Sequence, residues 1–86
     1  MTLFEFNEME LSEKHRFLFG KSGEDHVRFN SLRDNNEYKY KLWYCGDFFV
    51  EMQYSKAQKK VVNIEGIPLN DPRIDLYIEF AKNSID

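Results

Sequence analysis

The sequence predicts an α+β domain in which an N-terminal helix, a four-stranded antiparallel β-meander and a C-terminal helix pack in two layers. The central stretch, residues 37–54, alternates its side chains with a period of two and is rich in aromatic residues, as β-strands are. The flanking segments carry apolar stripes at helical spacing, and the aromatic sheet face is the surface that both are expected to cover. With 86 residues, 42% of them hydrophobic, the chain suits one domain, residues 1–86.

The first helix is expected to begin after Asn7. Asparagine is a favourable N-cap, and Glu10, three residues later, completes a capping box. Gly20 is the candidate C′ glycine, and the connection to the sheet runs from there to His26. The apolar stripe of this helix consists of Leu11, His15, Leu18 and Phe19.

Four short strands are expected between the helices. Residues 34–36 are strong turn material, and the polar segment 55–58, which lacks glycine, favours a loop based on a type I turn. Gly66 and Pro68 close the last strand. The expected strands are residues 26–33, 38–44, 48–54 and 60–67.

The second helix is expected to begin at Asp71 and Pro72. Aspartate suits the N-cap, and proline suits the first helical position, where its missing N–H group costs nothing. The inward stripe of this helix would consist of Ile74, Tyr77, Ile78, Ala81 and Ile85.

The register of the central hairpin depends on the length of its turn. A three-residue loop at 45–47 places residues of like character on the same sheet face and sets Lys41 opposite Glu51, a favourable cross-strand charge pair. A two-residue loop would instead place Trp43 opposite Val50 and mix the faces. The residue pattern therefore favours the three-residue loop.

With that register, Trp43 and Phe49 form a cross-strand pair on the sheet face opposite the aromatic core. Lys41 and Glu51 lie beside them. An exposed aromatic pair of this kind can anchor an interface with another protein or with a second copy of the chain, as a homodimer. The alternative, weighted equally, is that the C-terminal helix or the connection at 20–26 covers the pair as a satellite core.

A rival hypothesis treats the same face as a platform for single-stranded nucleic acid. Trp43 and Phe49 would stack on bases while Lys39 and Lys41 contact phosphates. The charge distribution disfavours nucleic acid as a partner, because the net charge of −3 divides into −3, +3 and −3 over residues 1–25, 26–60 and 61–86.

The sequence offers little for catalysis or metal binding. His15, His26 and Cys45 are the candidate soft-metal ligands, and their spacing is not that of a zinc site. Cys45 lies in a turn with no base that the sequence places beside it. The chain also lacks a phosphate-binding glycine loop. No enzymatic activity, cofactor, metal or small-molecule substrate is therefore expected.

Composition also bears on location. A lone cysteine is typical of a reducing compartment, and the N-terminus is acidic where a signal peptide would be basic. No apolar run approaches the length of a membrane span. A cytoplasmic protein without membrane contact is expected.

The chain resembles a group of small bacterial proteins of unknown function. These share an N-terminal helix opened by a Phe-Asn pair and a hairpin of the form LY-x-x-x-DFFVE-x-x-Y. The corresponding residues here are Phe6-Asn7, Leu42-Trp43, the segment 47–51 and Tyr54, with Trp43 in place of the usual tyrosine and a longer connection at 20–26. The resemblance implies the helix-and-meander fold and no activity. A small non-enzymatic protein–protein interaction module, or an accessory or inhibitor protein, is the function expected.

Overall fold

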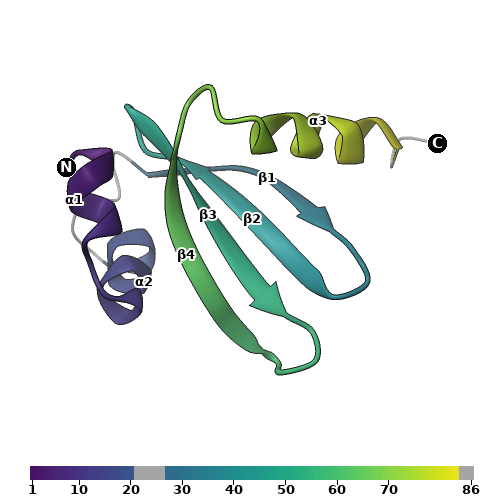
Figure 1. Ribbon diagram of the computed structural model, residues 1–86, viewed down its shortest axis with the longest axis horizontal. Helices are drawn as coiled ribbons and strands as arrows, with labels where there is room; N and C mark the ends of the chain where they lie inside the picture. Colours follow the sequence, from purple (N-terminus) through teal and green to yellow (C-terminus); the bar gives the residue numbers. More distant parts are fainter. Residues whose placement is uncertain (21–26, 84–86) are drawn as a thin grey trace.

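The computed structural model describes residues 1–20 and 27–83, and it confirms the α+β class and the order of elements. The four strands form one antiparallel sheet in the order β1-β2-β3-β4, so neighbours in the sequence are neighbours in the sheet (Figure 1). The elements are α1 (Leu3–Asn7), α2 (Leu11–Phe19), β1 (Arg28–Asp34), β2 (Tyr38–Tyr44), β3 (Phe48–Ser55), β4 (Lys60–Pro68) and α3 (Arg73–Asn83).

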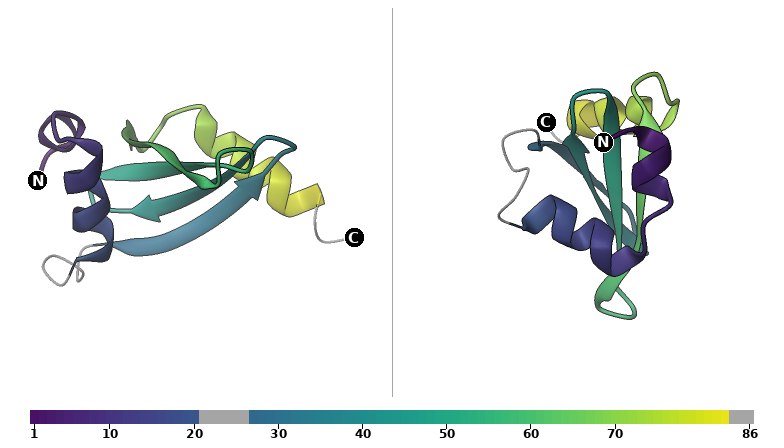
Figure 2. Two further views of the ribbon diagram at one scale, coloured as in Figure 1. Left: turned by 90° about the horizontal axis from the view of Figure 1, so that it is seen from below. Right: turned by 90° about the vertical axis from the view of Figure 1, so that its left-hand side faces the viewer.

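The helices lie on opposite faces of the sheet. The predicted two-layer packing placed the N-terminal and the C-terminal helix on the same aromatic face, whereas the structure has them on different faces. α1 and α2 cover one end of the face that carries Trp43 and Val50, which we call the α1/α2 face (Figure 2). α3 covers the other face, which carries Leu42 and Ile67 and which we call the α3 face.

Each face has its own apolar cluster. On the α1/α2 face, the ring of Phe6 is fully buried and lies 5.4 Å from the ring of Phe17 and 5.7 Å from that of Phe48. On the α3 face, Tyr77 packs on Leu42 and Ile67. The first cluster consists of Phe6, Leu18, Trp43, Phe48, Val50, Met52 and Ile64.

The helical N-terminus differs from the prediction. Thr2, not Asn7, is the first N-cap, and its side chain forms a capping box with Glu5. Asn7 is instead the last residue of α1, and its side-chain amide bonds the backbone of Gly66. Glu10, the N-cap of α2, makes no side-chain capping bond.

The hairpin register is also different from the prediction. The N–H of Cys45 donates to the carbonyl of Phe48 at 2.9 Å, which leaves a two-residue turn, and Trp43 lies opposite Val50. Gly46, at the first turn position, has φ +90°, as expected for a hairpin turn that matches strand twist. The prediction assumed a single apolar face, whereas both faces are partly covered by helices.

The first turn of the sheet and the start of α3 agree more closely with the prediction. The Asn35 side chain accepts backbone N–H bonds from Glu37 and Tyr38 in the predicted turn, and Asp71 caps α3 by accepting from the N–H of Arg73 at 2.8 Å. Ile78 is exposed and does not join the inward side of α3. The predictions for His26 and Ile85 concern positions outside the described residues.

We expect Gly66→Ala to destabilise the fold. A Cβ at this position would lie 2.7 Å from Cδ1 of Leu3 and 3.2 Å from Cδ2 of Phe6, so the Leu3 side chain or α1 itself would have to shift. Overpacking of this kind costs about 1–3 kcal/mol in the free energy of unfolding, measurable by urea denaturation. The loss should be smaller in a Leu3→Ala background, where space is available. Equal losses in both backgrounds would contradict the steric explanation.

Candidate functional site

Part of the α1/α2 face is left uncovered. α1 and α2 lie at one end of the sheet, and the half of this face nearer the β1–β2 and β3–β4 turns has no helix over it (Figure 2). A groove of about 360 Å³ lies there. Its lining residues, together with two exposed apolar β1 residues on the same face, form what we call the open face: Phe29, Leu32, Lys39, Lys41, Met52, Tyr54 and Val61. The third exposed β1 residue on this face, Asp34, is paired with Lys56.

The alternation of side chains along β2 and β3 determines which residues lie on the open face. Lys39 and Lys41 point to the same side of β2, and their partners on β3 are Tyr54 and Met52. Two cationic side chains therefore stand beside two apolar ones. Both lysines are exposed, and neither makes a hydrogen bond or ion pair with any of the described residues.

Strand β1 adds exposed apolar side chains beside these two lysines. Phe29 and Leu32 are 54% and 50% exposed, and Leu32 lies directly opposite Lys41. The ring of Phe29 makes an edge contact with Trp43 at 5.8 Å. The open face thus offers large apolar side chains at the sheet edge and unpaired cations one strand further in.

The four predicted site residues do not share a surface. Trp43 is only 7% exposed, because the rings of Phe19 and Phe29 lie against it at 5.5 and 5.8 Å. Phe49 is on the α3 face, half-buried, with Tyr44 beside it at 5.6 Å. The expected Trp43–Phe49 pair is therefore wrong, since the two-residue turn shifts β3 by one residue and sends Phe49 to the other face.

Of the other two, Lys41 lies on the open face and Glu51 on the α3 face. The expected Lys41–Glu51 pair is likewise wrong, since Lys41 is opposite Met52. Phe29 and Leu32 were not among the predicted site residues. They are three positions apart, so strict alternation would place them on opposite faces, and only the register shift between Phe29 and Ser31 brings them to the same face.

Glu51 is the centre of a buried charge cluster under α3. It is 6% exposed, and its carboxylate accepts a bond from the hydroxyl of Tyr77 at 2.8 Å. Arg33 from β1 and Arg73 from α3 lie 3.3 and 3.4 Å from its oxygens. Burial, and then the Glu51 carboxylate, raise the pKa of Tyr77. With its oxygens engaged by three donors, Glu51 is suited to hold elements together.

Arg73 extends this cluster to β4. Its guanidinium donates to both oxygens of Glu65, at 3.2 and 3.0 Å, and to Asp71 at 3.1 Å. The bonds from Arg73 lower the pKa of Glu65 and that of Asp71. The start of α3 is thereby joined to two strands by one side chain.

The remaining candidates for chemistry are poorly placed. Burial raises the pKa of Cys45 to about 11, so its thiol stays protonated at neutral pH and is a weak nucleophile. His15 is exposed, with its ring 4.7 Å from that of Phe19. Within residues 1–20 and 27–83, no three metal-ligating side chains come together. His26 lies outside those residues.

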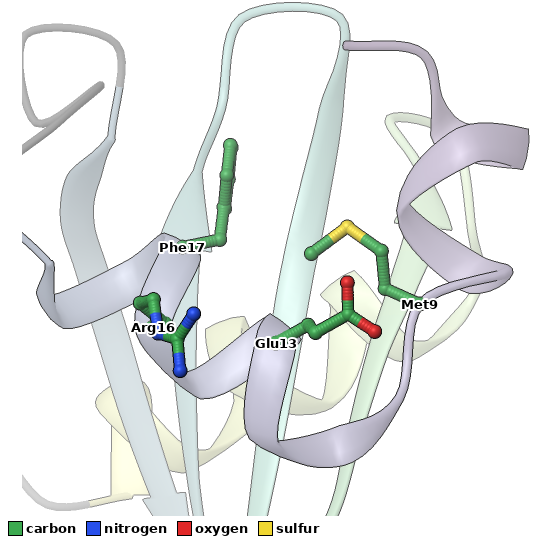
Figure 3. Close-up of a pocket in the computed structure, with 4 residues that line it drawn as sticks. All are labelled: Met9, Glu13, Arg16 and Phe17. Atoms are coloured by element: carbon green, nitrogen blue, oxygen red, sulfur yellow. The ribbon is translucent and has the colours of Figure 1, made fainter.

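A second hollow, of about 210 Å³, lies beside α2. Figure 3 shows Met9 from the α1–α2 connection and Glu13, Arg16 and Phe17 from α2 around it. Met9 and Phe17 are half-buried and pack on the cluster beneath the helix. The hollow is the outer side of that cluster, with one acid and one base near it.

Comparisons with protein-family models, curated proteins and solved structures gave no match to this chain. The resemblance to small bacterial proteins therefore stays a prediction. None of the described helices has both the length and the apolar character that crossing a membrane requires.

We expect Glu51→Gln to be strongly destabilising. Removing the charge leaves Arg33 and Arg73 near an uncharged group in a buried site, and breaking such a cluster costs about 3 kcal/mol. Urea denaturation measures the loss. Glu65→Gln is the matched control, because the Glu65 carboxylate is 41% exposed and its pairing contributes about 1 kcal/mol or less. Equal effects of the two substitutions would contradict the assignment of Glu51 as the cluster's centre.

The burial of Trp43, the single tryptophan, is also directly measurable. We expect a blue-shifted emission maximum and weak quenching by acrylamide at every protein concentration, because the side chain is covered within one chain. Phe19→Ala should shift the emission to the red by uncovering one edge of the indole ring. A wild-type emission that reddens on dilution would instead mean that a second copy covers Trp43.

Proposed function

We propose that this protein is a small non-enzymatic interaction module, acting as an accessory or inhibitor protein, that binds another protein through the open face. The observation that carries the proposal is the combination of exposed Phe29 and Leu32 on β1 with two lysines that line the neighbouring groove and that no described residue pairs. Exposed apolar side chains beside a polar rim are typical of interfaces. The engagement of Glu51 by three donors and the raised pKa of Cys45 support a binding role over a catalytic one.

The charges on the open face favour a partner other than a second copy. If two open faces met, Lys39 and Lys41 of each copy would approach like charges. An acidic surface with apolar side chains would neutralise the lysines and bury Phe29 and Leu32 at the same time. The partner that fits is therefore an acidic region of another protein.

The nucleic-acid alternative loses its main support. Its stacking platform required Trp43 and Phe49 side by side, and these residues are on opposite faces, one buried and one half-buried. The net charge of −3 adds to the argument.

In-cell photo-crosslinking tests the proposal. A benzoylphenylalanine at position 32 should yield an adduct with one acidic protein, identified by mass spectrometry and then rebound in purified form. The control position is 76, since Leu76 is 47% exposed on the outer side of α3. Lys39→Glu with Lys41→Glu should abolish the adduct. Equal crosslinking from positions 32 and 76, or adducts with nucleic acid, would overturn the proposal.

A further inference from the structure

The outer edge of β4 is closed by the N-terminal helices. The Asn7 side chain accepts from the N–H of Gly66 at 2.7 Å and donates to its carbonyl at 3.0 Å, as a neighbouring strand would. Lys14 donates to the carbonyl of Ile64 at 2.9 Å. Both backbone groups of Gly66 and the carbonyl of Ile64 are thus bonded within the chain, which disfavours further pairing at this part of the edge.

The outer edge of β1 is different. The N–H of Asn35 donates to the carbonyl of Tyr38 at 3.0 Å, so these two residues form a hydrogen-bonded pair. Such pairs alternate with non-hydrogen-bonded pairs along an antiparallel ladder. The backbone N–H and C=O groups of Leu32 and Asp34 therefore point away from β2. No other described residue bonds these outward groups. β1 is also the most exposed strand, with only Ser31 and Arg33 half-buried, both on the α3 face.

We propose that β1 binds an extended, acidic segment of a partner protein, which adds to the sheet as a fifth strand. This rests on the proposed function and specifies how the partner is bound. Main-chain bonds to Leu32 and Asp34 would provide affinity, and alternate side chains of the added strand would lie on the open face. Apolar side chains there would contact Phe29 and Leu32.

The proposed acidic character of the partner segment follows from the position and charge of Lys39 and Lys41. A strand added beside β1 lies about 10 Å from β2, a gap that a lysine and a glutamate side chain together span. Lys39 and Lys41 are therefore within reach of acidic side chains on the new strand. β1 of a second copy could not supply them, because its one acidic residue, Asp34, is held by Lys56.

The test uses a phage-displayed library of random twelve-residue peptides, selected on the intact wild-type protein. The peptides recovered should alternate apolar and acidic residues and lack proline in their centre. Lys39→Glu with Lys41→Glu should reverse the charge preference, so that basic peptides are recovered. Recovery of helical or basic peptides by the wild type would overturn the inference.

Substitution of Leu32 tests the backbone contact. Leu32→Pro removes only an outward N–H, which costs the sheet no ladder bond, and should weaken binding of the selected peptide by about tenfold or more. Leu32→Val keeps both the N–H and an apolar side chain, and should bind within about threefold of wild type, since it removes one methylene. Equal binding by the two variants would exclude strand addition.

Hydrogen exchange by NMR provides a readout that needs no variant. The amides of Leu32 and Asp34 should exchange rapidly in the free protein and become protected by the selected peptide, while that of Arg33 is protected in both states. If the peptide instead protects no β1 amide but its binding is lost in Lys41→Glu, strand addition is wrong and docking on the open face stands. If the peptide binds without involving Lys41 or β1, both proposals fail.

Discussion

The arrangement of this small domain depends on the buried carboxylate of Glu51. A carboxylate that is 6% exposed must be met by charged or hydrogen-bonding partners, because its desolvation alone costs several kcal/mol. Its partners come from two other elements: Arg33 from β1, and Arg73 and Tyr77 from α3. This requirement fixes which face of β3 points to α3. It also fixes where α3 begins, since Arg73 must reach Glu51, Glu65 and Asp71 at once.

The two faces of the sheet are consequently different in kind. Charge and aromatic groups share the α3 face, where the guanidinium of Arg33 lies 3.8 Å from the centre of the Tyr40 ring. The α1/α2 face is purely apolar only where the short helices reach, around Phe6 and Phe48. Because α2 ends at Phe19, the same face continues beyond it with no described helix over it. The open face is thus a result of short N-terminal helices on a longer sheet.

Local signals in the sequence predicted the elements, and non-local pairing is where prediction failed. Alternation identified the strands, and Asp71-Pro72 identified the start of α3, because both signals act over a few residues. The register needed knowledge of the partners of Glu51, which lie 18 and 22 residues away. The prediction placed apolar residues on one face and therefore chose a three-residue loop. The true loop is one residue shorter, which moves both Phe49 and Glu51 to the opposite face from the one predicted. Lys41 and Trp43 share a face of β2 as expected, because that depends on alternation within β2 alone.

Asn7 shows how one residue type can satisfy two structural needs. Asparagine before a helical stripe is favourable as an N-cap, and the same amide geometry matches the backbone groups of a strand edge. The choice depends on Gly66, whose missing side chain lets α1 approach β4 closely. With Asn7 at Gly66 and Lys14 at Ile64, this part of β4 is occupied by the N-terminal helices, which favours β1 as the edge where an added strand would pair. The N-terminal helices therefore determine which edge can bind a partner, although they lie at the opposite edge.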